Sequence, residues 1–481
     1  MRCKSGNLEP ERGQNSAKVF VPAERGGRTS HFSTFTRDFN PQFCFPVVSM
    51  SKLQTPQSPK GTRDFYPESE RLENYVFDTW RKVAESFAYE EYEGPTFEHL
   101  ELYTGKSGEE IVTQLYNFTD KGGRELALRP EMTPTLARLV IQRARELKKP
   151  FKWFSIPRLF RYEKAQKGRL REFFQLNMDV LGTESIYAEA DLIAALATML
   201  RKFGLADSDF VIGVSSRKLL SCYLDELGAK DKDLVYPALD KRLKLGPEAF
   251  AKALSEAGLS AEQAGQLDSF MACKSLEEVG KFIGGEEAAK ALGEISELFE
   301  ALEEAGFGDS VALDLSVVRG LAYYTGIVFE VFDKGKAMRA IAGGGRYDSL
   351  TEKLGGERIP GVGFGMGDVV LTDLLRDHGL LPSPKQSVDF YLATFTGDLK
   401  KVFGLASNFR ALGPECVVSH PLSKLKLVKQ MEQANSQGAK LVVFVDGDKA
   451  PEGSFEFKDL RTGEMHVGTP AELLLSLEGE K

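Results

Sequence analysis

Residues 152–172 read Lys-Trp-Phe-Ser-Ile-Pro-Arg-Leu-Phe-Arg-Tyr-Glu-Lys-Ala-Gln-Lys-Gly-Arg-Leu-Arg-Glu. Lys167-Gly168-Arg169 predicts a turn between two antiparallel strands, with cations on the loop and Arg161 on the strand before it. The stretch carries seven cations and two anions, whereas the whole chain has a formal net charge of −8. A hairpin of this kind can aim guanidinium groups at phosphate oxygens with fixed geometry. A solvated, charged hairpin without a ligand is the alternative.

A second β-type stretch, Gly361-Val-Gly-Phe-Gly-Met-Gly367, has glycine at every second position. On a strand the four glycines share one face and the three apolar side chains share the other. No register of the stretch fits the dinucleotide-binding pattern Gly-x-Gly-x-x-Gly. A face without side chains lets a flat ring lie on the backbone. A flexible loop or a close contact between sheet and helix explains the pattern equally well.

Three further stretches combine core-type residues with polar ones. Residues 128–134 place a carboxylate and a hydroxyl at a predicted helix start, where the acid could simply complement the helix dipole. Residues 318–326 bring one arginine and two tyrosines together before an apolar strand, and residues 343–348 predict a tight glycine-rich turn. Each has an explanation in packing alone, but their joint occurrence favours a ligand site.

Composition excludes several classes of protein. Of 481 residues, 42% are hydrophobic and 27% charged, which is typical of a globular protein, and no apolar run approaches the ~18 residues of a membrane span. Five cysteines without a Cys-x-x-Cys pair argue against a disulfide framework or a zinc site. The acidic net charge excludes a broad nucleic-acid-coating surface, although a local basic groove remains compatible with it.

The chain divides by pattern into five segments. Residues 1–49 are interpreted as a disordered extension or a misassigned start, with a targeting presequence as the alternative. Residues 50–205 and 311–383 form two parts of one β-rich core, and residues 206–310 have the helical periodicity of an insertion. From residue 388 to 481 strands and helices alternate, which predicts a separate mixed α/β domain.

Together these segments resemble the histidyl-tRNA synthetases, a family of class II aminoacyl-tRNA synthetases. The matching segments, in family order, are Lys60-Gly-Thr-Arg-Asp-Phe-Tyr-Pro67, Leu128-Arg-Pro-Glu-Met-Thr133, Phe160-Arg-Tyr-Glu163, Gly168-Arg-Leu-Arg-Glu-Phe-Phe-Gln175, Arg319-Gly-Leu-Ala-Tyr-Tyr-Thr-Gly326 and Gly343-Gly-Gly-Arg-Tyr-Asp348. The similarity covers about residues 56–475. It implies an α+β fold: a catalytic core on an antiparallel sheet, with the helical insertion and a C-terminal mixed α/β anticodon-binding domain.

The resemblance implies a histidine–tRNA ligase. Such an enzyme activates L-histidine with ATP and Mg²⁺ to histidyl-adenylate, and then transfers histidine to the 3′ end of tRNA(His). It also implies a homodimer in the cytoplasm, or in an organelle if residues 1–49 are a targeting segment. A non-catalytic histidine or tRNA sensor, such as an ATP phosphoribosyltransferase regulatory subunit, is the alternative. That paralogue resembles the core but lacks an anticodon domain.

The resemblance also assigns roles to single residues. The catalytic residues are Arg161 and Arg319. Histidine is bound by Glu131, Met132, Thr133, Gln175, Asp179, Arg319, Tyr323 and Tyr324. ATP is bound by Arg161, Glu163, Gly363, Gly365 and Gly367, which makes the glycine strand the floor beneath adenine. The acceptor end of tRNA is bound by Gln166 and Arg169. No metal ligand from the protein itself is expected beyond ATP-bound Mg²⁺.

Two positions depart from the common family pattern. Many bacterial relatives have Glu at the position of Asp179. The third motif of the family usually ends Gly-Leu-Glu-Arg, whereas this chain reads Gly367-Asp-Val-Val370, as in a subgroup with Gly-Asp at this place. Valine cannot donate to phosphate. Either another cation serves the γ-phosphate, with Arg346 as a candidate, or ATP binds differently, or activation is weakened.

Overall fold

The computed structural model describes residues 56–104, 112–164, 166, 168–240, 242, 245–319, 323–335, 340–383, 387–413, 416–447 and 450–478. The predicted extension, residues 1–49, lies outside the described residues.

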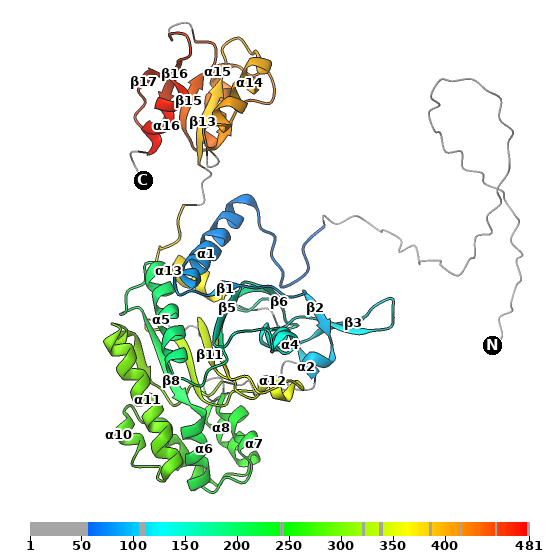
Figure 1. The fold of residues 1–481 in the computed structure, drawn as a ribbon, viewed down its shortest axis with the longest axis vertical. Coiled ribbons are helices and arrows are strands. Elements are labelled where there is room, and N and C mark those ends of the chain that lie inside the picture. The colour runs from blue at the N-terminus through cyan, green and yellow to red at the C-terminus, as the bar shows by residue number, and fades with distance from the viewer. Residues whose placement is uncertain are drawn as a thin grey trace, which may run out of the picture. The chain divides into compact units, whose positions relative to one another are not determined.

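The core is built on a mainly antiparallel sheet (Figure 1). Among the described residues nine strands form it, in the order β1-β5-β7-β12-β11-β10-β8-β9, with β6 also paired to β7. Only β1 with β5 and β8 with β9 are parallel. The strands are β1 (Glu90–Glu91), β5 (Phe151–Ser155), β6 (Arg158–Phe160), β7 (Glu172–Leu181), β8 (Phe210–Ser216), β9 (Val311–Leu313), β10 (Ile327–Asp333), β11 (Ala342–Arg346) and β12 (Gly361–Gly367). The predicted antiparallel core is confirmed.

Three helices, α1 (Pro67–Ser86), α5 (Tyr187–Lys202) and α13 (Asp368–Asp377), pack with one another and with β7 and β12. Helix α1 begins at a proline and has Glu68 and Glu70 in its first turn, both favourable at a helix N-terminus. Its fully buried Trp80 donates a hydrogen bond from Nε1 to Sδ of Met366 on β12, at 3.1 Å. The apolar side chains of β12 therefore face the helices.

A small sheet of order β2-β4-β3 adjoins the segment that leads to the predicted site. It consists of β2 (Phe97–His99), β3 (Tyr116–Thr119) and β4 (Glu125–Leu128), with helices α2 (Glu101–Thr104), α4 (Thr133–Arg143) and α12 (Leu350–Lys353) nearby in the fold. Helix α4 begins where it was predicted, directly after Met132, so that residue 131 lies at its N-terminal end.

The helical region begins later than predicted. Residues 210–216 form β8, which pairs along its whole length with β10 in the core sheet. The predicted start of the insertion at residue 206 was therefore wrong, because this short apolar run is a buried strand. The helices of the region are α6 (Arg217–Glu226), α7 (Lys232–Asp240), α8 (Pro247–Glu256), α9 (Ala261–Met271), α10 (Leu276–Val279) and α11 (Glu286–Glu304), followed by the short 3₁₀ helix η2 (Gly308–Ser310).

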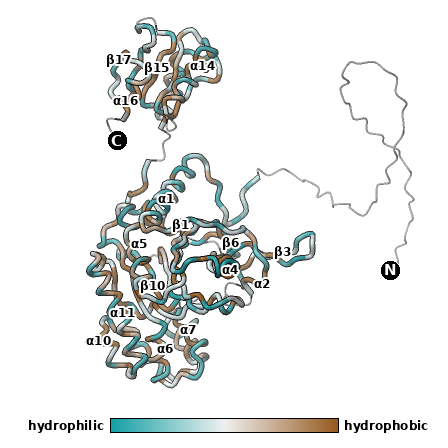
Figure 2. Tube along the Cα trace, in the orientation of Figure 1, coloured by the Kyte–Doolittle hydropathy of each residue, from teal (hydrophilic) through white to brown (hydrophobic). Residues whose placement is uncertain are grey.

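The C-terminal unit has its own five-stranded sheet, in the order β14-β13-β15-β16-β17. Its elements are β13 (Val388–Ala393), α14 (Leu399–Arg410), β14 (Val418–Ser419), α15 (Leu427–Ser436), β15 (Ala439–Phe444), β16 (Phe455–Asp459), β17 (Met465–Gly468) and α16 (Pro470–Glu478). Strand β15 is predominantly apolar (Figure 2), since both of its faces are covered by helices. Among the described residues, no helix is both long and apolar enough to cross a membrane.

Candidate active site

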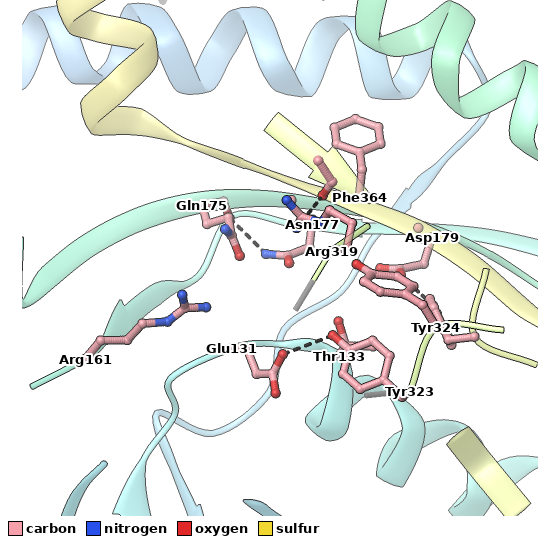
Figure 3. Close-up of a pocket in the computed structure, with 14 residues that line it drawn as sticks. Glu131, Thr133, Arg161, Gln175, Asn177, Asp179, Arg319, Tyr323, Tyr324 and Phe364 are labelled. Atoms are coloured by element: carbon pink, nitrogen blue, oxygen red, sulfur yellow. Dashed lines mark hydrogen bonds between the residues drawn. The ribbon is translucent and has the colours of Figure 1, made fainter. Parts of the chain in front are cut away.

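Strand β7 supplies one wall of a polar pocket. Gln175, Asn177 and Asp179 alternate along it, so their side chains share one face, and all three line the pocket (Figure 3). The intervening Leu176 and Met178 are fully buried in the core on the other face. Gln175 and Asp179, both predicted to bind histidine, therefore lie on the same face of β7.

The alternating glycines of β12 make room for the side chains of its neighbours. A Cβ atom at Gly363 would lie 1.9 Å from Oδ1 of Asp179, and one at Gly365 would lie 2.8 Å from the Gln175 side chain. At Gly367 no atom of the described residues lies within 4 Å of such an atom. The sequence suggested a bare glycine face. This face instead holds polar side chains that line the pocket.

Two arginines from distant segments line this same pocket. Arg161 follows β6 directly rather than lying on it, and its Nε donates to the carbonyl of Pro130 at 2.8 Å, which fixes the guanidinium. In Figure 3 its terminal nitrogens point into the pocket. Arg319 has a left-handed backbone with φ of 57°, and its Nη1 donates to Oε1 of Glu330 at 2.5 Å. The two arginines that the resemblance names as catalytic therefore line one pocket.

Two buried carboxylates of the pocket each accept a hydrogen bond from a tyrosine. Tyr323 donates to Oε2 of Glu131 at 3.0 Å, and Tyr347 donates to Oδ1 of Asp179 at 2.5 Å. Burial raises the pKa of Asp179 to about 7, while the hydrogen bond from Tyr347 lowers it. Burial also raises the pKa of both tyrosines well above their usual value, so they remain O–H donors.

Ten of the predicted residues line the pocket: Glu131, Thr133, Arg161, Gln175, Asp179, Arg319, Tyr323, Tyr324, Gly363 and Gly365. Five predicted residues do not. The Met132 side chain is fully buried in the core. Glu163 pairs with Arg169 at 2.6 Å in the hairpin loop, where Gln166 and Arg169 also form a backbone bridge. Gly367, at the end of β12, is the fifth.

The sequence suggested Arg346 as a cation for the γ-phosphate, but Arg346 cannot serve this role. It is 4% exposed, and its Nε and Nη2 donate to the two oxygens of Glu189, while Nη1 donates to Asp348. Residues 342–346 form strand β11 rather than the predicted turn, which directs this side chain into the core. Releasing the guanidinium would leave the Glu189 charge buried and unpaired.

Asp368 lies in the third motif, where this chain departs from the family pattern, and it also has a structural role. It is fully buried, pairs with Arg63 and accepts a hydrogen bond from the backbone N–H of Phe174 at 3.0 Å. Val370, at the family's arginine position, packs against the core. Through Asp368, the third motif of this chain therefore joins the segment before α1 that carries Arg63, strand β7 and helix α13. It does not supply a phosphate ligand.

Four pocket residues were not predicted: Asn177, Gly343, Tyr347 and Phe364. Asn177 could have been found, since it lies in the two-residue period between Gln175 and Asp179. Tyr347 stands in a quoted motif, but only the strand order brings it to Asp179. Among the described residues, no group of three or more His, Cys, Asp or Glu side chains could hold a metal ion.

Comparisons with known proteins agree with this site. The sequence model described as histidyl-tRNA synthetase matches residues 61–368. The histidine–tRNA ligase of Opitutus terrae is 43% identical over 424 residues, covering 85% of this chain and 95% of that protein. The chloroplastic/mitochondrial histidine–tRNA ligase of Arabidopsis thaliana is 40% identical over 411 residues, covering 85% and 84%. The crystal structure of histidyl-tRNA synthetase from Nostoc sp. PCC 7120 has a TM-score of 0.74 at 25% identity, covering 88% of this chain and 100% of that one. The chain belongs to the histidyl-tRNA synthetase family.

Proposed function

We propose that this chain is a histidine–tRNA ligase that works through the pocket between β7, β12 and the two arginines. It forms histidyl-adenylate from L-histidine and ATP with release of diphosphate, and transfers histidine to the 3′ end of tRNA(His) with release of AMP. The observation that carries the proposal is the meeting of Arg161 and Arg319 in one pocket with Asp179.

Activation requires two negatively charged groups to approach each other. The histidine carboxylate attacks the α-phosphorus of ATP, and diphosphate leaves. Arg161 and Arg319 stabilise the charge that both reactants carry into the transition state, and no general base is needed because the attacking carboxylate is already ionised. Both guanidiniums are held by carbonyl or carboxylate groups, so little reorganisation is required.

Histidine is selected by the polar groups around the pocket. Glu131, Thr133 and Gln175 bind its α-amino group, and Asp179 and Tyr324 bind the two imidazole nitrogens beside Tyr323. This is supported by the position of all six side chains in one pocket. An analogue without ring nitrogens would strand these buried groups, which can reject it by a factor of ~10⁴–10⁵.

ATP enters from the side of Arg161, with Mg²⁺ as its counter-ion. This is supported by the pairing of Gly367 with the pocket residue Gln175 and by the position of Glu163 in the chain two residues after Arg161, where it pairs with Arg169. Bound Mg²⁺ would neutralise phosphate charge, and its ligands would come mainly from the phosphates and water.

The tRNA contacts and the assembly extend beyond the pocket. Gln166 is exposed on the hairpin loop and Arg169 is half-buried beside it, which fits contact with the acceptor end. The C-terminal unit from residue 388 binds the anticodon. The chain up to the end of β8 and residues 311–383 form the catalytic core, and the helices α6 to α11 lie between these two parts in the sequence. The enzyme acts as a homodimer in the cytoplasm.

Histidine-dependent exchange of diphosphate into ATP tests the proposal. The wild-type protein should exchange, and Arg161→Ala should lower kcat about 10²–10³-fold, as removal of a preorganised donor does. Arg158→Ala is the matched control: both arginines lie over phenylalanines of β7, but Arg158 pairs with Glu172 and does not line the pocket. No exchange by the wild type would favour the sensor alternative, and equal losses in both variants would refute the role of Arg161.

A further inference from the structure

One buried hydrogen bond of the pocket crosses a strand. Asp179 on β7 and Tyr347, directly after β11, are separated by β12, which pairs with both strands. Their side chains nevertheless meet at 2.5 Å, and each residue is only 3% exposed. A contact over an intervening strand requires that strand to present no side chain at that point.

Two glycines of β12 provide this gap. Gly363 pairs with Asp179, and its missing Cβ would have overlapped Oδ1. Gly361 accepts a hydrogen bond from the backbone N–H of Tyr347 at 2.7 Å, and a Cβ there would lie 2.5 Å from Cε2 of the tyrosine ring. The glycine pattern at these two positions thus accommodates one tyrosine–carboxylate pair.

The pair leaves one carboxylate oxygen for a ligand. A carboxylate accepts hydrogen bonds through both of its oxygens. Within the described part of the chain, the one hydrogen bond that Asp179 makes is with Tyr347, through Oδ1. Because Asp179 lines the pocket, Oδ2 is the acceptor available to an N–H group that enters it.

We infer that Tyr347 is a positioning residue for histidine selection: it holds Oδ1 of Asp179 so that Oδ2 accepts from a ring N–H of the substrate. The inference rests on the proposed function. It also gives a role to Asp179, which stands where many bacterial relatives have the longer glutamate. A shorter side chain whose other oxygen is held by a hydrogen bond keeps a fixed acceptor at the pocket wall. A tyrosine hydroxyl is well suited to this, because it holds the carboxylate without neutralising it.

Within the part of the chain that the structure describes, no cation forms an ion pair with Asp179. The titratable groups near enough to feel its charge include Tyr89, Tyr92, Tyr324 and Tyr347, and Arg319 and Glu131 line the same pocket. Burial raises the pKa of Asp179 and the hydrogen bond from Tyr347 lowers it. Loss of the hydroxyl should therefore raise this pKa further, so the carboxyl is protonated at a pH where the wild type is ionised.

The test is the pH profile of kcat/KM for histidine in diphosphate exchange. Tyr347→Phe should raise KM for histidine about ten- to hundredfold at pH 7, with a smaller change in KM for ATP, and should move the acid limb about one pH unit higher. The ionisation of histidine itself is common to all variants. Gly361→Ala, which displaces the intact tyrosine, should move the limb in the same direction.

Tyr103→Phe is the matched control. Tyr103 is fully buried and its hydroxyl lies 3.4 Å from that of Thr135, but it does not line the pocket, so its loss should leave the limb in place. An equal loss of activity at every pH in Tyr347→Phe would overturn the inference and leave the ligase proposal standing. Absence of exchange in the wild type would instead overturn the proposed function.

Discussion

The two faces of β12 have opposite chemistry although one alternating sequence makes both. On one face the glycines leave space for Asp179, Gln175 and Tyr347, and the surface is polar. On the other face the apolar side chains pack against the helices, where Trp80 contacts Met366. The functional groups on the glycine face come from residues outside β12, whereas the apolar face is made by the side chains of β12 itself. The strand thus separates substrate recognition from core stability.

The buried carboxylates of the pocket and the buried Glu73 on the helix side have different partners. In the pocket each carboxylate has a tyrosine partner and is open to substrate. On the helix side Glu73 of α1 is 5% exposed, and its Oε1 has no hydrogen-bond partner among the described residues. The Glu73 carboxyl group instead lies beside that of Asp368. A buried carboxyl group that accepts from a hydroxyl stays functional as an anion, whereas one that lies beside a second carboxylate is neutralised.

The largest effect is expected from adding one methyl group to the glycine face. Gly363→Ala places Cβ against Oδ1 of Asp179 and 2.7 Å from the carbonyl oxygen of Met178, so the aspartate must move. We expect KM for histidine to rise at least about a hundredfold, because the ring loses its fixed acceptor. Exchange kinetics measure this, together with the thermal midpoint.

Gly367→Ala is the control on the same strand and face, since in the described part of the chain nothing lies within 4 Å of the added atom. Its KM for histidine should stay within about twofold of the wild type, an ordinary effect for an unobstructed position. Equal KM values for histidine in the two variants would remove the distinction between filled and open glycine positions.

A truncation on the apolar face should affect stability instead. Met366 is fully buried, so Met366→Ala should lower the free energy of unfolding by about 2–5 kcal/mol, with little change in KM for histidine. Thermal unfolding and exchange kinetics on the same sample separate the two effects. A large change in KM at unchanged stability would show that the two faces are not independent.

Sequence patterns located the pocket better than they described its contacts. The two-residue period of β7 was enough to place Gln175 and Asp179 on one face. The bond between Asp179 and Tyr347 joins positions 168 residues apart, and it depends on the strand order. The ion pair of Arg346 with Glu189 joins positions 157 apart, so no local pattern distinguished this buried arginine from a ligand-binding one. Strand β8 was missed because a short apolar run fits a buried helix segment equally well.

The smallest effect, and the one most dependent on pH, is expected at Glu73. Burial first, and the nearby charge of Asp368 second, raise the pKa of Glu73 from 4.5 to about 8. Between pH 4.5 and about 8 the unfolded chain releases this proton before the folded chain does, so the free energy of unfolding falls as pH rises through this window. Glu73→Gln cannot ionise and should be more stable than the wild type by about 1–3 kcal/mol at pH 8.5, and nearly equal to it at pH 4.5. Thermal midpoints at both pH values measure this, with the exposed Glu70→Gln of the same helix as control. A stability difference that does not change with pH would show that Glu73 is ionised in the folded protein. The contrast between the tyrosine-bound carboxylates of the pocket and Glu73 beside Asp368 would then fail.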